Sequence, residues 1–197
     1  NPGPREPSVH AAMCGGVAGS SAAASLMAAL AVGAGRYGGA REVFDAMSTW
    51  INGGQTLAVW EHPCTNPKPQ EMDVWPAPEH PPGFDPHGVS TATIVRQLLE
   101  RLNAMAEDMA QGSHLNWLAA HRQELEAKLG LPLAISGVAA AALVDLGFSA
   151  QQGEMLYLLL RLPGAAAHAL EQEEYGFKRF PFYPVELRND PAQTAAL

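Results

Sequence analysis

Charged residues are scarce in this chain. Asp, Glu, Lys and Arg make up 16% of its 197 residues, whereas an average soluble chain carries about 25%. So few charges suggest that another subunit covers part of the apolar surface. The net charge of -8 also lacks the basic excess that binding to nucleic acid or to an anionic membrane requires. We therefore expect neither of these two partners.

Cysteines and long apolar runs are also few. Cys14 and Cys64 lie far apart in the sequence, form no disulfide framework and are typical of free thiols in a reducing cytosol. The apolar segment 22–34 is shorter than the ~20 residues that span a bilayer. The first residues are polar and rich in proline and show no signal-peptide pattern. These observations predict a cytoplasmic protein.

Helical spacing of apolar residues runs through most of the chain, and no alternating strand pattern of useful length is present. On the segment 40–50, Val43, Phe44, Met47 and Trp50 fall on one helical face. The sequence therefore predicts an all-α fold. The expected helices lie within 9–32 and over 40–50, 90–111, 113–129, 137–146, 149–162 and 164–174. Ile94, Leu98, Leu102, Met105 and Met109 are the expected apolar stripe of the helix over 90–111.

Three segments show no helical pattern. They are a flexible arm over 1–8, a long proline-rich loop over 61–89 and an extended tail over 175–197, all within one region spanning 1–197. The loop contains side chains that can bind zinc, namely His62, Cys64, His80 and His87. Their spacing fits no compact zinc motif, and we expect no metal site.

Three stretches carry a family resemblance. The first is 28–40, which ends in Tyr37-Gly-Gly-Ala40. The second is Pro82-Gly-Phe84, followed by Asp-Pro-His87 and then Leu98-Leu-Glu100. The third is 138–172, which includes Ala142-Leu-Val-Asp-Leu-Gly-Phe148. In this order and approximate spacing, from about Ser8 to Tyr183, the chain resembles the citrate synthase and citryl-CoA lyase family.

The resemblance implies an all-α, citrate synthase-like multi-helical fold. Family members are homodimers with a large and a small domain, and they make or break a carbon–carbon bond between an acyl-CoA and a 2-oxo acid. An aspartate removes a proton from the acyl group, two histidines act on the carbonyl groups, and arginines hold the carboxylates of the oxo acid. This chain would correspond to part of the large domain, the small domain and the segment that returns to the large domain. Much of the amino-terminal large domain would be absent.

The three catalytic positions of the family are altered here. Tyr37 occupies the first histidine position, and His87 lies one place after the second. Ser136 stands where the family has its aspartate. Serine cannot take a proton from an acyl group near neutral pH without an activating base. Asp145 is no substitute, because it lies nearly three helical turns further on.

Binding residues are partly retained. Gly38 and Gly39 keep the close backbone approach of the family's loop, and Lys178 and Arg179 lie where family tails carry basic residues near the substrate or the CoA phosphates. The family's Asp-Pro-Arg clamp for a carboxylate is missing. Arg161 and His168 match the helix pattern of the third stretch, and we interpret them as structural.

Two hypotheses follow from these residues. The favoured one is a diverged protein, weakly active or non-catalytic, that acts as an acyl-CoA-binding or partner subunit in a homodimer or beside a catalytic relative. The alternative is an active enzyme of the citrate synthase or citryl-CoA lyase type that uses Tyr37, His87 and Ser136. Neither requires a resident cofactor, since a CoA thioester would be a substrate or ligand.

Overall fold

The computed structural model describes residues 6–36, 39–61, 80–108 and 113–180. Within these ranges the chain forms eight α-helices, one short 3-10 helix and an isolated bridge between Phe84 and Leu133. The predicted all-α class is confirmed. The helices are α1 Pro7–Val17, α2 Ala22–Gly33, α3 Ala40–Gly53, α4 Leu57–Glu61, α5 Thr93–Asp108, α6 Ser113–Leu129, α7 Ile135–Asp145, α8 Ala150–Tyr175 and η2 Phe177–Arg179.

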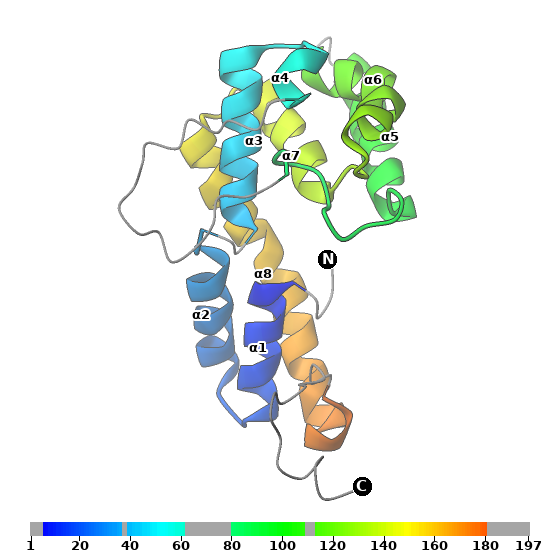
Figure 1. Ribbon diagram of the computed structural model, residues 1–197. Coiled ribbons are helices and arrows are strands. Elements are labelled where there is room, and N and C mark those ends of the chain that lie inside the picture. The colour runs from blue at the N-terminus through cyan, green and yellow to red at the C-terminus, as the bar shows by residue number, and fades with distance from the viewer. Residues whose placement is uncertain (1–5, 37–38, 62–79, 109–112, 181–197) are drawn as a thin grey trace, which may run out of the picture.

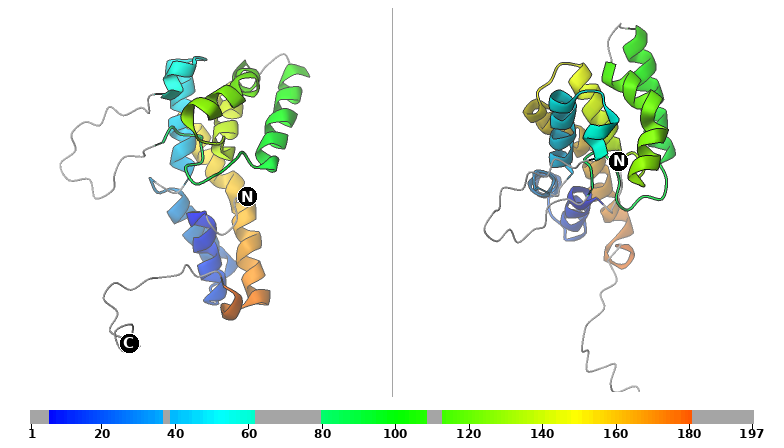
Figure 2. Two further views of the ribbon diagram at one scale, coloured as in Figure 1. Left: turned by 45° about the vertical axis from the view of Figure 1, so that its right-hand side comes forward. Right: turned by 45° about the horizontal axis from the view of Figure 1, so that its top comes forward.

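The helices form two lobes that share α8 (Figure 1). In the lower lobe, α1 and α2 pack against each other and against the second half of α8. The upper lobe contains α3 to α7 together with the first half of α8, and Figure 2 shows the same division from two other sides. None of the helices within the described ranges is long and apolar enough to cross a lipid bilayer.

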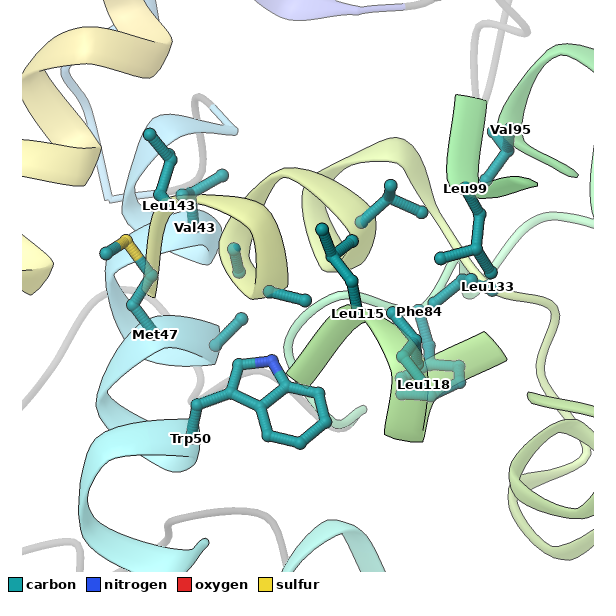
Figure 3. Packing of buried hydrophobic residues seen from close by; sticks show 14 of the residues in the cluster. Val43, Met47, Trp50, Phe84, Val95, Leu99, Leu115, Leu118, Leu133 and Leu143 are labelled. Carbon is teal, nitrogen blue, oxygen red and sulfur yellow. The ribbon is translucent and has the colours of Figure 1, made fainter. Parts of the chain in front are cut away.

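The main hydrophobic core lies in the upper lobe (Figure 3). Val43, Met47 and Trp50 of α3 are buried in it, which confirms the apolar face predicted for this helix. They pack with Leu115 and Leu118 of α6, and the Trp50 ring meets the Trp60 ring edge-on at 4.9 Å. Buried aromatic rings of this size contribute a large share of a core's stability.

The apolar stripe predicted for α5 is confirmed in part. Met109 lies outside the described residues. Leu98 and Leu102 pack against the core, but Ile94 and Met105 are 61% and 60% exposed, and Val95 and Leu99 are buried instead. The reason is that α5 lies at the edge of the upper lobe and packs mainly against α6 and α7, so a narrow face of this helix is covered. Apolar residues flank that face on both sides, and their spacing alone does not identify the covered side.

The lower lobe is packed with small side chains. Ala12, Ala29, Ala165 and Ala169 are buried together where α1, α2 and α8 meet. A Cβ atom at Gly16 would lie only 2.3 Å from the carbonyl oxygen of Ala169. The close helix packing expected from this alanine- and glycine-rich sequence is therefore present.

The two helices predicted over 149–162 and 164–174 are one helix, α8, with Pro163 in its interior. Proline usually ends or kinks a helix because it lacks an N–H group and its ring crowds the preceding turn. Here packing on both sides of Pro163 holds the helix together, because its first half contacts α3 and its second half contacts α1 and α2. The helix begins with a capping box between Ser149 and Gln152.

The ends of the predicted arm, loop and tail also differ from the structure. Glu6 caps α1, which begins at Pro7, so residues 6–8 belong to an ordered helix start rather than to a flexible arm. Glu61 is the last residue of α4, and the start of the predicted tail contains Tyr175 of α8 and the 3-10 helix η2. In each case a cap or a packed neighbour orders residues that look irregular in the sequence. Residues 80–89 of the predicted loop are described and form no helix, whereas 1–5, 62–79 and 181–197 lie outside the described residues.

Candidate functional site

The loop at 80–85 lies directly against the start of α7. The Asp85 N–H donates to the Pro132 carbonyl at 2.9 Å, and the Ala134 N–H donates to the Gly83 carbonyl at 2.9 Å. Gly83 has a φ of 91°, and a Cβ atom there would lie 2.8 Å from the Gly137 Cα. Two glycines facing each other therefore allow the loop backbone to touch the helix backbone.

Ser136 is the second residue of α7 and lies buried beneath this loop, with 4% of its surface exposed. This is the position where the resemblance placed the altered base. Its neighbour Gly137 is the residue that contacts Gly83. The loop, the start of α7 and Ser136 thus form one local arrangement.

Glu42, in the first turn of α3, supplies a carboxylate at the same place. Its Oε1 accepts a hydrogen bond from the Gly83 N–H at 2.9 Å, and its carboxylate also accepts one from the Ser136 side chain. Burial raises the pKa of Glu42 above its ordinary value. The Gly83 and Ser136 hydrogen bonds and the nearby His80 lower the pKa only in part, so Glu42 holds its proton more tightly than a free glutamate.

Arg161 of α8 and Glu6 form a shielded ion pair beside these residues. Arg161 Nη2 lies 2.7 Å from Glu6 Oε2, and the two side chains are 13% and 8% exposed. Gly39, at the N-cap of α3, has a φ of 97°, and a Cβ atom there would lie 2.6 Å from Arg161 Nη1. The retained glycine therefore makes room for a guanidinium group.

Tyr157 lies one helical turn before Arg161 on α8 and is buried. Burial is the main cause that raises the pKa of Tyr157 to about 12, and the carboxylates of Glu42 and Glu6 raise it further, against the lowering effect of Arg161. The phenol is therefore neutral at physiological pH. It adds a hydrogen-bond donor to the site without adding charge.

Two of the predicted site residues lie beside residues that were not predicted for the site. Ser136 lies beside Glu42, and Gly39 lies against Arg161. His87 is exposed, and its backbone N–H donates to Asp85 Oδ1 at 2.9 Å. His80, rather than His87, is the histidine whose charge acts on Glu42. Tyr37 and Gly38 lie outside the described residues.

Lys178 and Arg179 lie apart from this cluster within the chain. Both are exposed on η2, which follows the end of α8 at Tyr175. Helix residues 161 to 175 place the end of α8 about 21 Å beyond Arg161, at a rise of ~1.5 Å per residue. A role for these two residues in ligand binding stays a prediction.

Arg161 and His168 have the structural partners that their interpretation expected. Arg161 pairs with Glu6, and His168 Nδ1 lies 2.7 Å from Glu171 Oε2. Asp145, which the sequence already ruled out as the missing base, caps α6. Its carboxylate accepts hydrogen bonds from two backbone N–H groups at the start of that helix and lies 2.6 Å from His114 Nδ1.

Sequence reasoning missed Glu42, Glu6 and Tyr157. A signal for Glu42 was present, since Glu42, Ala46 and Thr49 follow an i, i+4, i+7 spacing and the last two are buried. This spacing places a carboxylate on a buried face of α3. No comparable signal exists for Glu6, which was assigned to a flexible arm.

A groove of about 650 Å³ lies where the start of α5 faces the end of α6. Arg96 and Arg122 contribute positive charge to its wall. Pro132 also lines the groove, and its carbonyl accepts the Asp85 N–H in the backbone pairing that includes Gly83. Glu126 is engaged there by the Thr91 hydroxyl and, at 2.7 Å, by Arg122 Nη1. The groove and the Glu42 cluster are therefore connected through the backbone pairing of 83–85 with 132–134.

The described residues contain no group of three or more His, Cys, Asp or Glu side chains placed to hold a metal ion. His80 Nδ1 lies 3.1 Å from the Pro81 carbonyl oxygen, and His87 is on the exposed turn that follows. His62 and Cys64 fall outside the described ranges.

Comparison with known proteins identifies the fold. The sequence matches no protein-family model and no curated protein. The structure is similar to that of citryl-CoA lyase from Hydrogenobacter thermophilus, with a TM-score of 0.63 and 19% sequence identity, over 99% of this chain and 76% of that one. The fold expected from the three sequence stretches is confirmed. At this identity the likeness concerns the fold, and function has to be argued from the site.

Proposed function

We propose that this protein binds an acyl-CoA thioester. The acyl end would lie at the cluster formed by Glu42, Ser136 and Gly83, and the nucleotide end would lie in the groove beside Arg96. The closeness of the two sites carries this proposal: Pro132 lines the groove and its carbonyl pairs with Asp85, two residues after Gly83. An elongated ligand with a reactive acyl end and a phosphate-bearing end needs two binding sites near each other. The fold neighbour, a citryl-CoA lyase, is an enzyme of a CoA-linked substrate.

Charge supports this orientation of the ligand. Arg96 is exposed on the first turn of α5 and faces the groove, so its guanidinium is available for a phosphate. The start of α5 also lines the groove, and the positive end of a helix dipole favours an anion there. Beside the cluster at the other end, the Tyr157 phenol is a neutral donor, which suits an uncharged thioester better than a phosphate.

Efficient condensation with a 2-oxo acid is not part of the proposal. Arg161, whose charge acts on Tyr157, is already paired with Glu6 at 2.7 Å and is therefore not available to a second carboxylate without breaking that pair. Serine at position 136 supplies no base of its own. These two features favour a binding or partner subunit with weak activity at most.

The alternative, an active carbon–carbon lyase or synthase, is favoured by one observation. Glu42 restores a carboxylate next to Ser136, at the position where the family resemblance placed the base. A citryl-CoA cleavage assay that detects acetyl-CoA and the released oxo acid separates this candidate from a binding protein.

Calorimetry and thermal unfolding with acetyl-CoA and with CoA test the proposed binding. Ligand at 100 times its dissociation constant should stabilise the folded chain by about 2.7 kcal/mol. Arg96→Ala should weaken binding of both ligands, whereas Arg101→Ala, which changes an exposed arginine of the same helix that does not line the groove, should not. Absence of any shift at millimolar acetyl-CoA would refute the proposal.

The partner is proposed on the basis of exposed apolar side chains. Met27 of α2 and Leu159, Leu160 and Leu170 of α8 are each at least half exposed. With so few charged residues in the chain, a second subunit over these helices would remove apolar surface from water. Light scattering coupled to size-exclusion chromatography measures the mass directly, and a monomer at micromolar concentration would contradict this part of the proposal.

A further inference from the structure

We infer that Glu126 decides which phosphate group the groove between α5 and α6 accepts. The groove takes a singly charged phosphate, such as each phosphate of the diphosphate bridge of CoA, and rejects the more highly charged phosphate monoester on the ribose of CoA. The inference rests on the proposed function, because it requires that the nucleotide end of a CoA thioester lies in this groove. Glu126, which lines the groove, is then a specificity-determining residue.

Three of the described residues that line the groove are charged, and two of these form a pair. They are Arg96, Arg122 and Glu126. Arg122 Nη1 lies 2.7 Å from Glu126 Oε2, and the two side chains are 19% and 20% exposed. Their partial shielding from water strengthens the attraction between them. The positive charge of Arg122 is therefore largely offset where a ligand would meet it.

Hydrogen bonds hold the Glu126 carboxylate in the groove wall. Its Oε1 accepts the Thr91 hydroxyl and, at 3.3 Å, the Leu133 N–H. The same N–H also donates to Thr91 Oγ1 at 3.1 Å. These bonds tie the end of α6 to the segments that precede α5 and α7, so the carboxylate cannot turn away from a bound anion without losing them. A fixed negative charge of this kind selects between ligands by repulsion.

Arg96 supplies the positive charge that a ligand can use. It is exposed, and its Nη2 donates to the Thr93 hydroxyl, a neutral partner, at 3.3 Å. The start of α5 adds the equivalent of about half a positive charge, so the groove offers roughly one and a half positive charges near Arg96. With a fixed carboxylate in the same groove, this balance suits one negative charge at a time.

A second carboxylate borders the groove on the side of the 80–85 loop. A Cβ atom at Gly88 would lie 2.9 Å from Asp85 Oδ2 and 2.7 Å from Pro132 Cγ, so Asp85 is close to a residue of the groove wall. The uncharged arm of CoA, between the diphosphate and the thioester, can pass this carboxylate without electrostatic cost. A phosphate placed there would be repelled, which keeps the charged groups of the ligand at the Arg96 end.

CoA carries both kinds of phosphate, and dephospho-CoA lacks only the monoester on the ribose. Each phosphate of the diphosphate bridge has one negative charge, whereas a phosphate monoester has about 1.5 to 2 at pH 7. One additional unit charge in contact with a carboxylate in a water-like medium changes an equilibrium constant by about 5-fold. Comparing the two ligands therefore isolates the effect of the more highly charged group.

Isothermal titration calorimetry of the full chain with CoA and with dephospho-CoA tests the inference. Wild type should bind dephospho-CoA at least as tightly as CoA. Glu126→Gln keeps an amide oxygen that can accept the Thr91 hydroxyl and the Leu133 N–H, but it removes the negative charge and releases Arg122. In this variant, the affinity for CoA relative to that for dephospho-CoA should rise by about 5-fold or more.

Two further variants separate the charge of Glu126 from its structural role and from the charge of the whole protein. Glu126→Asp shortens the side chain but keeps its charge, so it should keep the wild-type preference. Glu124→Gln removes an exposed carboxylate of the same helix that does not line the groove, and it should also leave the preference unchanged.

The outcomes distinguish the inference from the proposed function. A wild-type preference for CoA, an unchanged preference in Glu126→Gln, or the same change in Glu126→Asp overturns the inference and leaves the proposed function standing. No binding of either ligand removes both. If Glu126→Gln does not fold, Ala127→Arg adds a guanidinium at an exposed residue of the groove without touching the Arg122 pair. It should favour CoA by about 5-fold, and an unchanged preference there also overturns the inference.

Discussion

The contact between Gly83 and Gly137 predicts different outcomes for two glycine substitutions. Gly83 and Gly147 have φ angles of 91° and 81°, a region that alanine adopts at a cost of about 1–2 kcal/mol. A Cβ atom at Gly147 would meet nothing within 4 Å, but one at Gly83 would lie 2.8 Å from the Gly137 Cα. Gly147→Ala therefore measures backbone strain alone, and Gly83→Ala measures strain plus crowding.

The extra cost at Gly83 follows from what must move. Overpacking a rigid contact costs about 1–3 kcal/mol, and a loop that moves away to relieve it loses the Gly83–Glu42 hydrogen bond, a bond to a charged group worth about 1.5–3 kcal/mol. Gly83→Ala should therefore be about 1–3 kcal/mol more destabilising than Gly147→Ala. With a urea m-value of ~2 kcal/mol per molar, the midpoints should differ by roughly 0.5–1.5 M.

Urea unfolding followed by circular dichroism measures both midpoints, and similar m-values in the two variants would show that the same surface is exposed. Equal midpoints would refute the argument, because they would mean that the 80–85 loop does not press on α7. Gly137→Ala offers a reciprocal check. Its Cβ atom would lie 2.5 Å from the Gly83 carbonyl oxygen, so it should destabilise the fold although alanine favours helix.

Three further predictions concern the charged groups. The pKa of Glu42 is raised in the folded chain, so on raising the pH the unfolded chain releases this proton first. The free energy of unfolding of wild type should therefore fall as the pH rises from about 4.5 through the raised pKa. Urea midpoints measured across this pH range should fall less in Glu42→Gln. Glu6→Gln should lower the free energy of unfolding by about 3–5 kcal/mol, because the charge of Arg161 is then largely buried without a counter-charge. In urea unfolding, the double variant Glu6→Gln with Arg161→Met should recover much of that loss. Asp145→Ala should lower the free energy of unfolding by about 1–2 kcal/mol, because α6 loses its cap. Asp145→Asn should lower it clearly less. Equal losses in the two variants would show that capping is not the cause.

The helices were predictable from the sequence where an apolar face is unambiguous. Val43, Met47 and Trp50 repeat along α3, which was predicted over 40–50 and extends three residues further, to Gly53. For α5 the pattern was right for Leu98 and Leu102 but failed for Ile94 and Met105. Apolar residues occur on more than one side of this helix, and only the neighbours decide which side is covered. Pro163 misled for a related reason: the local preference to break a helix was outweighed by packing on both halves of α8.

The site was predictable only in part. Ser136 was identified as the altered base position from the family resemblance, but Glu42 lies 94 positions earlier in the sequence, and only the folded chain shows that they share a hydrogen bond. The partner of Arg161 was missed because Glu6 precedes the first helix in a stretch that reads as irregular. Pairings over such distances depend on helix packing, which residue spacing does not encode.

The division of α8 between the two lobes has a consequence for synthesis. Helices α1 and α2 end at Val17 and Gly33, but the helix that completes their packing begins only at Ala150. At a translation rate of about 5–20 residues per second, that gap lasts roughly 6–25 s. During this interval the alanine-lined faces of α1 and α2 have no permanent partner from α8. A nascent chain stalled before Ala150 should therefore recruit chaperones through this hairpin, and one that extends past Phe180 and clears the ribosome exit tunnel should release them.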